Sequence, residues 1–193
     1  MSVLVGGDAR GTAIGMAPDA RWIAVRIFDD DGYAAMSAAH AGFQWLLDPD
    51  GRPATADAPD VVSNSWGYEV TGCFTEFRLD LAALRAAGVL PVFSAGNSGP
   101  DAGTGTSPGN NPEAFPIGAT DNLDAIYARS SRGPSLCDAT ETFPAMTAPG
   151  VGIRTAYISG PLAYAHWSGT SLAAPHVAGA LALLLSAGGD LSL

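Results

Sequence analysis

Lysine is absent from this sequence of 193 residues, and its nine basic residues, all arginine, are outnumbered by 19 acidic ones. The formal net charge is −10, whereas a surface that binds nucleic acid needs a basic face for the phosphates. Nucleic acid is therefore not expected as a partner. Long apolar runs are also missing. The longest, Val177–Leu185, falls well short of the ~20 residues that span a bilayer, so no membrane partner is expected.

Cysteine is scarce as well. Cys73 and Cys137 are the only two cysteines, so they allow at most one intrachain disulfide and cannot form a zinc site by themselves. The sequence leaves open whether they pair. The stretch Met1–Gly7 has no basic region and no apolar core long enough for a signal peptide, so the sequence itself gives no route of export.

The composition indicates a folded chain with a sizeable core, because 47% of the residues are hydrophobic and only 15% are charged. We expect a single domain over residues 1–193. Its 24 glycines and 14 prolines follow no fixed period, which is typical of tight loops between short elements. The acidic run Asp29–Asp31 before Gly32 suits a turn as well as a cation-binding loop. We predict no metal site and no cofactor.

Strand-like and helix-like segments alternate along the first half of the chain. Apolar, β-rich runs predict strands at Trp22–Phe28, Asp60–Trp66 and Val89–Ser94, and helical spacing of apolar residues predicts helices at Ala34–Leu47 and Phe77–Ala87. This alternation is typical of a parallel sheet with right-handed crossovers. The predicted fold is therefore α/β, with three layers and a doubly wound, mostly parallel sheet, whose active site lies at the carboxyl ends of the strands.

A long Gly/Asn/Ser/Pro-rich loop follows Ser94, and its position after a strand favours function over disorder. The last element starts at Gly169 and runs to Ser186, and it is apolar on nearly every side, so we expect a buried helix. Between the two lie short strand-like pieces. They are Phe115–Ala119, Ala145–Ala148, Ile153–Tyr157 and Tyr164–Trp167.

Ser171 lies at the predicted start of this last helix. The free N–H groups and the positive end of the helix dipole favour an oxygen that becomes negative, so Ser171 is a candidate nucleophile. The alternative is that a serine here only caps the helix. Pro175 fits either role, because a proline in the first turn lacks an N–H that would have no partner there.

Asn97 follows the predicted strand Val89–Ser94. Its side-chain amide is a candidate donor to a developing oxyanion, with Gly96 and Gly99 leaving room for a substrate. The alternative is an asparagine that only shapes a turn. In a parallel sheet, Asn97 and Ser171 lie at the same edge of the domain, which favours the catalytic role for both.

Five segments resemble signatures of the subtilisin-like serine peptidases (peptidase family S8), in the order in which that family carries them. GTSLAAPHVAG resembles the nucleophile signature, SAGNSGP the segment of the oxyanion asparagine, and SWG the substrate-binding strand. GMAPDARWIAVRIF and TAPGVGI match two further family segments. The ranges are Gly169–Gly179, Ser94–Pro100, Ser65–Gly67, Gly15–Phe28 and Thr147–Ile153. The sequence is therefore identified as a member of this family.

The resemblance implies a serine endopeptidase in which Ser171 attacks a peptide carbonyl while Asn97 and the Ser171 N–H hold the oxyanion. A peptide or protein substrate is expected to add as a strand between Ser65-Trp66-Gly67 and Asp31-Gly32-Tyr33. Gly96 and the loop near Pro108 are expected to wall the specificity pocket. The family also implies secretion. Some members bind Ca²⁺, but this sequence does not support a calcium site.

The sequence departs from the family in lacking the segments that carry the histidine base and its aspartate. Val3–Gly7 resembles the tail of the helix that begins at that histidine, and we expect a chain that is truncated at both ends. The family analogy places the aspartate on a strand between Trp22–Phe28 and Asp60–Trp66, so the subtilisin-like sheet is expected to be incomplete. The missing N-terminal segment, as a separate fragment, is a candidate partner.

The remaining histidines are poor replacements for the base. His176 is expected to pack on the last helix, His40 to lie on the outside of a crossover helix, and His166 lacks an orienting acid. We therefore expect little peptidase activity from this chain alone. The alternative function is a non-catalytic pseudopeptidase that binds extended peptides. An unrelated α/β-hydrolase is disfavoured, since no G-x-S-x-G turn surrounds Ser171.

Overall fold

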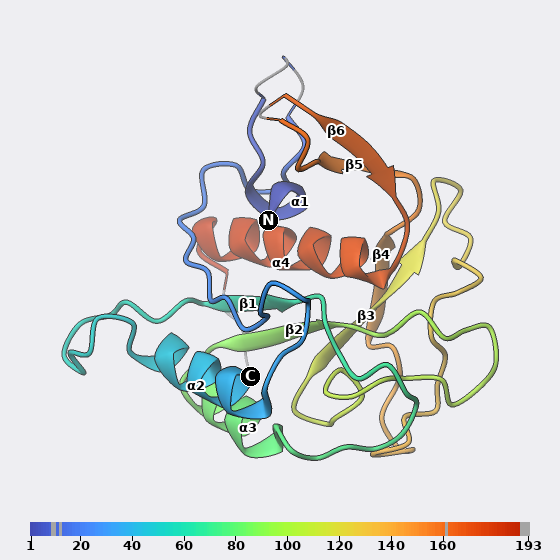
Figure 1. Ribbon diagram of the computed structural model, residues 1–193, viewed down its shortest axis with the longest axis horizontal. Helices are drawn as coiled ribbons and strands as arrows, with labels where there is room; N and C mark the ends of the chain where they lie inside the picture. Colours follow the sequence, from blue (N-terminus) through green and yellow to red (C-terminus); the bar gives the residue numbers. More distant parts are fainter. Residues whose placement is uncertain (9–10, 12, 161, 190–193) are drawn as a thin grey trace.

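The computed structural model describes residues 1–8, 11, 13–160 and 162–189. It consists of a parallel sheet between two helical layers, with a small hairpin above (Figure 1). The helices are α1 (Ser2–Val5), α2 (Met36–Leu47), α3 (Arg78–Ala86) and α4 (Thr170–Ser186). The strands are β1 (Val61–Asn64), β2 (Leu90–Ser94), β3 (Phe115–Thr120), β4 (Met146–Pro149), β5 (Ile153–Ala156) and β6 (Tyr164–Trp167).

The main sheet has four strands in the order β1-β2-β3-β4, and every neighbouring pair is parallel. Its register aligns Ser63 with Val92, Val92 with Phe115, and Ile117 with Met146. β5 and β6 form a separate antiparallel pair. The expected parallel α/β architecture is confirmed, and β1 and β4 are the two edges of the sheet.

The first hydrophobic core lies between the sheet and the layer formed by α2 and α3 (Figure 1). Phe43 on α2, Leu81 and Leu84 on α3, and Phe93 on β2 are all buried in it. The helices predicted at Ala34–Leu47 and Phe77–Ala87 are confirmed as α2 and α3. Burying one such side chain stabilises the fold by about 1.5–3 kcal/mol.

The second core lies on the opposite face, where α4 covers β2, β3 and β4. Val92 and Ile117 of the sheet are fully buried, as are Ala173 and Ala174 of α4. The alanines let the helix lie close to the strands. As a result, the start of α4 is fixed against the carboxyl end of β2.

The expected strand Trp22–Phe28 is wrong, because this segment is extended but pairs with no described strand. It lies against α2, where a Cβ on Gly42 would be only 3.1 Å from Cγ1 of Val25 and 3.2 Å from Cγ2 of Ile27. A strand needs a neighbour that takes up its N–H and C=O groups, and a groove separates this segment from β1. The sheet is therefore incomplete on the β1 side, as the sequence led us to expect.

The burial expected for the whole last helix is found only in its first half. Beyond Gly179 the side chains leave the sheet, and Leu183 and Leu184 are 46% and 50% exposed. Among the described helices, none has the length and apolarity needed to cross a bilayer.

The two cysteines, whose pairing the sequence left open, form a disulfide. Cys73–Cys137 joins two long loops across 64 positions of sequence. Beside it, the side-chain amide of Asn110 donates to the carbonyl of Gly72, and that of Asn111 donates to the carbonyl of Phe74. The disulfide thus ties the loop between β1 and α3 to the loop between β3 and β4. The two asparagines tie it to the loop that follows β2.

Candidate active site

Ser171 is the second residue of α4, and the residue that caps this helix is Gly169. The capping role considered for Ser171 is therefore wrong, since its hydroxyl lies inside the first turn. Among the described residues, neither the Ser171 hydroxyl nor its backbone N–H makes a hydrogen bond. Both groups remain available to a ligand at the positive end of the helix dipole.

Asn97 is held against this helix start by its own carboxamide. The backbone N–H of Thr170 donates to Oδ1 of Asn97 over 2.9 Å, and Oγ1 of Thr170 lies 3.2 Å from the same oxygen. Because the oxygen faces Thr170, the NH₂ group points away from it and, among the described residues, has no partner. The NH₂ group of Asn97 is thus fixed relative to the start of α4, where Ser171 directly follows Thr170.

Thr170 fastens the helix start to the strand end. It is fully buried, and its hydroxyl lies 3.2 Å from the carbonyl oxygen of Gly96 and 3.3 Å from the Gly96 nitrogen. Sequence reasoning missed this residue, although it directly precedes Ser171. The sequence signal for Thr170 was its place in Gly169-Thr170-Ser171, at the start of the predicted helix.

Two glycines permit this close approach. Gly96 has a φ of +105°, and a Cβ there would lie 2.7 Å from Oγ1 of Thr106. Gly169 has a φ of +156°, and a Cβ there would lie 3.3 Å from Oδ1 of Asn97. The backbone of Gly169 therefore packs directly on the carboxamide of Asn97.

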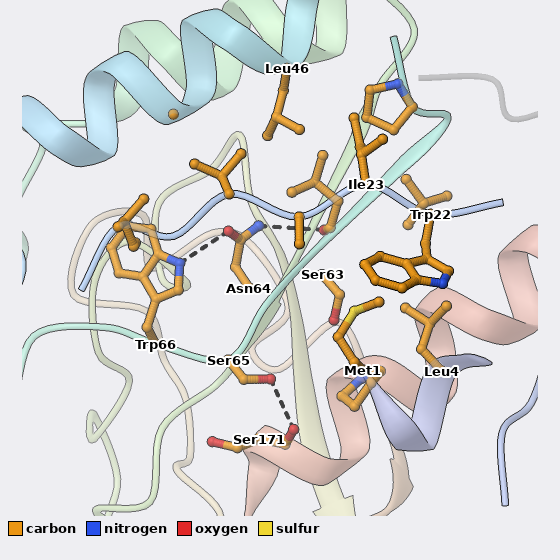
Figure 2. A pocket seen from close by; sticks show the side chains of 18 of the residues that line it. Met1, Leu4, Trp22, Ile23, Leu46, Ser63, Asn64, Ser65, Trp66 and Ser171 are labelled. Atoms are coloured by element: carbon orange, nitrogen blue, oxygen red, sulfur yellow. Dashed lines mark hydrogen bonds between the residues drawn. The ribbon is translucent and has the colours of Figure 1, made fainter. Parts of the chain in front are cut away.

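Ser65 follows β1 and reaches the same helix. Its hydroxyl donates a 2.8 Å hydrogen bond to the carbonyl oxygen of Ser171, as Figure 2 shows. Pro175 lies inside α4, four residues after Ser171, and not in its first turn as expected. Since proline has no N–H, the Ser171 carbonyl has no donor within the helix, and Ser65 supplies one.

The side chain of Trp66 belongs to the first core. Its Nε1 donates to Oδ1 of Asn64 over 3.1 Å (Figure 2), and its ring packs edge-on against Phe77 and Phe93 at 5.6 Å. Gly67 lies against the next loop, where a Cβ would be 2.9 Å from the carbonyl oxygen of Ser107. Any substrate contact from these residues therefore comes from backbone groups.

Gly32 and Tyr33 lie in an exposed turn beyond Trp22–Phe28. Oδ1 of Asp29 accepts hydrogen bonds from the backbone N–H groups of Asp31 and Tyr33, and Gly32 has a φ of +85°. Asp29 therefore serves as a turn cap. Tyr33 is 76% exposed, and within the described part of the chain no hydrogen bond joins this turn to Ser65–Gly67.

The described histidines do not bond to Ser171. Nδ1 of His176 lies 2.8 Å from the carbonyl oxygen of Leu172, and His166 is exposed on β6. His40 does not merely lie on the exterior of its helix. Its Nδ1 is 2.8 Å from Asp80 and its Nε2 is 3.1 Å from Glu76. These hydrogen bonds, that to Glu76 first, raise the pKa of His40 above its ordinary value.

Comparison with known proteins gives a family match over nearly the whole chain. The family model described as "Subtilase family" matches residues 2–192. Bacillopeptidase F of Bacillus subtilis is 42% identical over 98% of this chain, which covers 14% of that protein. Subtilisin-like protease 3 of Pseudogymnoascus destructans is 37% identical over 94% of this chain, which covers 42% of that protein.

A solved structure, that of Sphericase, superposes with a TM-score of 0.80 at 26% identity, over 100% of this chain and 62% of that one. A helix start that presents a serine beside a fixed asparagine amide, at the carboxyl ends of parallel strands, offers donors of the kind that stabilise a developing oxyanion. The chain belongs to the subtilase family. It spans less than two thirds of the length of these relatives.

Proposed function

We propose that this chain carries the nucleophile and the oxyanion donors of a serine endopeptidase that acts on peptide or protein substrates. The observation that carries the proposal is the fixed Asn97 carboxamide: its NH₂ group, like the hydroxyl and N–H of Ser171, has no hydrogen-bond partner among the described residues. Oγ of Ser171 would form a bond to the substrate carbonyl carbon. The carbonyl oxygen would take up the negative charge between Asn97 and the Ser171 N–H.

The proton of the Ser171 hydroxyl has to leave during this attack. In the part of the chain that the structure describes, no histidine is hydrogen-bonded to that hydroxyl. We therefore propose that turnover by this chain alone is very low, and that a separate polypeptide fragment supplies the base. In subtilisin itself, removing members of the triad costs on the order of 10⁶ in kcat, and ~10³ to 10⁴ over water remains.

The second candidate function is binding without cleavage. Ser65 and Gly67 are exposed and follow the edge strand β1, and their backbone groups are suited to pairing with an extended peptide. A pseudopeptidase of this kind would bind peptides equally well with and without the Ser171 hydroxyl. Secretion remains an expectation, and the Cys73–Cys137 disulfide supports it because such bonds persist in oxidising compartments.

Labelling by a fluorophosphonate tests the nucleophile. We expect intact-mass spectrometry to show one adduct on the wild-type chain, none on Ser171→Ala, and an unchanged adduct on the control Ser168→Ala. The rate should rise steadily with hydroxide concentration, without a step in the range where histidine titrates, because no imidazole serves as the base. Equal labelling of Ser171→Ala would show that Ser171 is not the nucleophile. A step in the labelling rate over the pH range where histidine titrates would contradict the proposal that this chain alone has no histidine base.

A further inference from the structure

Asn97 lies in a loop after β2, between two glycines. Gly96 has a φ of +105°, and Gly99 follows two residues after Asn97. Glycine has access to more backbone conformations than other residues, and both Asn97 and Ser98 are exposed. The bond from the Thr170 N–H fixes the carboxamide oxygen of Asn97. The direction of the NH₂ group therefore also depends on what holds the backbone of this loop.

One residue, Ser131, holds the backbone on both sides of Asn97. The Ser131 N–H donates to the carbonyl oxygen of Gly96 over 3.0 Å, and the Ser131 hydroxyl oxygen accepts a 3.2 Å hydrogen bond from the Ser98 N–H. A Cβ on Gly96 would lie 2.8 Å from the same hydroxyl oxygen, so the two segments are in direct contact. The Gly96 carbonyl and the Ser98 N–H belong to the two planar peptide groups that flank the Cα of Asn97. These two bonds therefore set both backbone dihedral angles of Asn97.

The segment that contains Ser131 is itself anchored to the sheet. Ser131 is fully buried, at 0% exposure. Its neighbour Ser130 accepts a 3.1 Å hydrogen bond at Oγ from the N–H of Ala119 in β3. The Gly99 N–H donates to the carbonyl oxygen of Arg129 over 3.0 Å, which extends the contact to the far side of the Asn97 loop. The backbone of Asn97 is thus held from β3, whereas its carboxamide oxygen is held from α4.

We propose that Ser131 is a positioning residue for the oxyanion donor, because its N–H and its hydroxyl oxygen together fix the backbone of Asn97. Donors to a developing oxyanion are effective when they are already in place and need no reorganisation during the reaction. In the part of the chain that the structure describes, Ser131 makes no hydrogen bond to Ser171, so it acts through Asn97. The inference rests on the proposed function, since the position of the NH₂ group affects the rate only if an oxyanion forms there.

The alternative is that the Ser131 hydroxyl only stabilises the fold, as a buried hydrogen-bonded hydroxyl does in many places. Ser130 provides the matched comparison. It is the adjacent residue, it is 1% exposed, and its hydroxyl oxygen also accepts one backbone N–H. That N–H belongs to Ala119 in β3 and not to a peptide group beside Asn97. The substitution Ser130→Ala therefore removes the same kind of bond without touching the Asn97 loop.

The first test measures the rate at which a fluorophosphonate labels Ser171 in the full chain. Ser131→Ala, which removes the acceptor of the Ser98 N–H, should slow labelling by about three-fold to ten-fold, the range expected for one hydrogen bond. Ser130→Ala should leave the rate unchanged. In the background of Asn97→Leu, Ser131→Ala should cause no further slowing, because the residue through which it acts is gone. Equal slowing by both serine variants, or equal slowing by Ser131→Ala in both backgrounds, would overturn the proposal.

The second test does not depend on the reactivity of Ser171. The backbone NMR order parameters of Asn97 and Ser98 should be near about 0.85 in the wild-type chain and in Ser130→Ala, and should fall toward about 0.6 in Ser131→Ala. Values below about 0.6 in the wild-type chain, or values that stay near about 0.85 in Ser131→Ala, would overturn the role of Ser131. If the order parameters change as expected but Ser171 is not labelled in the wild-type chain, the proposed function fails while the positioning of Asn97 by Ser131 stands.

Discussion

The Ser65 hydroxyl donates a 2.8 Å hydrogen bond to the Ser171 carbonyl oxygen, which has no donor within α4 because Pro175 lacks an N–H. A serine from the end of an edge strand thus replaces a missing helical hydrogen bond. The replacement ties the proposed nucleophile to β1 as well as to β2. The proline and the serine act together, although more than a hundred positions of sequence separate them.

This pair can be tested with a double-mutant cycle. Ser65→Ala should lower the free energy of unfolding by about 0.5–1.5 kcal/mol, because the Ser171 carbonyl loses its donor. In the background of Pro175→Ala, which restores a helical N–H, the same change should cost almost nothing. Urea denaturation of the four proteins measures the coupling. Equal costs of Ser65→Ala in both backgrounds would contradict the replacement.

The oxyanion role of Asn97 predicts a large loss on its removal. Asn97→Leu should slow fluorophosphonate labelling of Ser171 by about 10²–10³, the loss in kcat known for removing one oxyanion-hole donor from subtilisin, a relative of this chain. Ser98→Ala is the matched control, since within the described part of the chain Ser98 is bonded only through its backbone N–H, to Oγ of Ser131. An unchanged rate in Asn97→Leu, with Ser171 still labelled, would leave Asn97 as a turn residue.

The disulfide should contribute substantially to stability. Replacing both Cys73 and Cys137 by serine should lower the free energy of unfolding by about 2–4 kcal/mol, because the link closes a long loop in the unfolded chain. Reductant should destabilise the wild-type chain by a similar amount and leave the double variant unchanged. Thermal unfolding with and without reductant measures both. An equal effect of reductant on the two proteins would contradict this assignment.

His40 should make stability depend on pH. Its pKa is raised in the folded chain, first by Glu76 and then by Asp80, so the folded state holds the proton more tightly than the unfolded state. The stabilisation is complete below the unfolded pKa of about 6.5 and is lost as the pH rises through the raised value. We expect about 0.2–1 kcal/mol from these partly exposed ion pairs.

The measurement compares the free energy of unfolding near pH 5 and near pH 9. His40→Gln should reduce the loss of stability between these two conditions by that amount. His166→Gln, which changes an exposed histidine on β6, should leave the loss as it is in the wild-type chain. A loss that is the same in His40→Gln and the wild-type chain would show that His40 carries no such pH dependence.

The sequence correctly predicted the helices that can be recognised from the spacing of residues within one short segment. Met36, Ala39, Phe43 and Leu46 recur at helical spacing, and α2 lies where that spacing placed it. The helix predicted over Phe77–Ala87, closed by Gly88, is α3. Strand Trp22–Phe28 was wrong because its apolar residues satisfy the same pattern whether or not a neighbour is present to pair with. The burial predicted for the second half of α4 was wrong for a similar reason. The apolar sequence of a helix does not indicate how far the sheet extends beneath it.

The candidate site was predictable in part. Ser171 was found from its position at the start of the last helix and Asn97 from its position after the strand Val89–Ser94, and the structure brings the two segments together. Thr170 and the bond from Ser65 were missed because they depend on contacts between distant segments. Pro175 was the sequence signal for the bond from Ser65. A proline inside a helix has no N–H, so the carbonyl four residues earlier, here that of Ser171, needs a donor from another segment.

The buried Thr170 is the first residue of α4, the helix that covers the second core, and it is hydrogen-bonded to Gly96 and Asn97 after β2. Asn97 therefore cannot leave Ser171 by a small loop fluctuation, because α4 would have to detach from the sheet. The reactive geometry should vanish only when that whole layer opens, so the rate at which Ser171 loses its reactivity in denaturant measures cooperative opening of the protein and not local fraying.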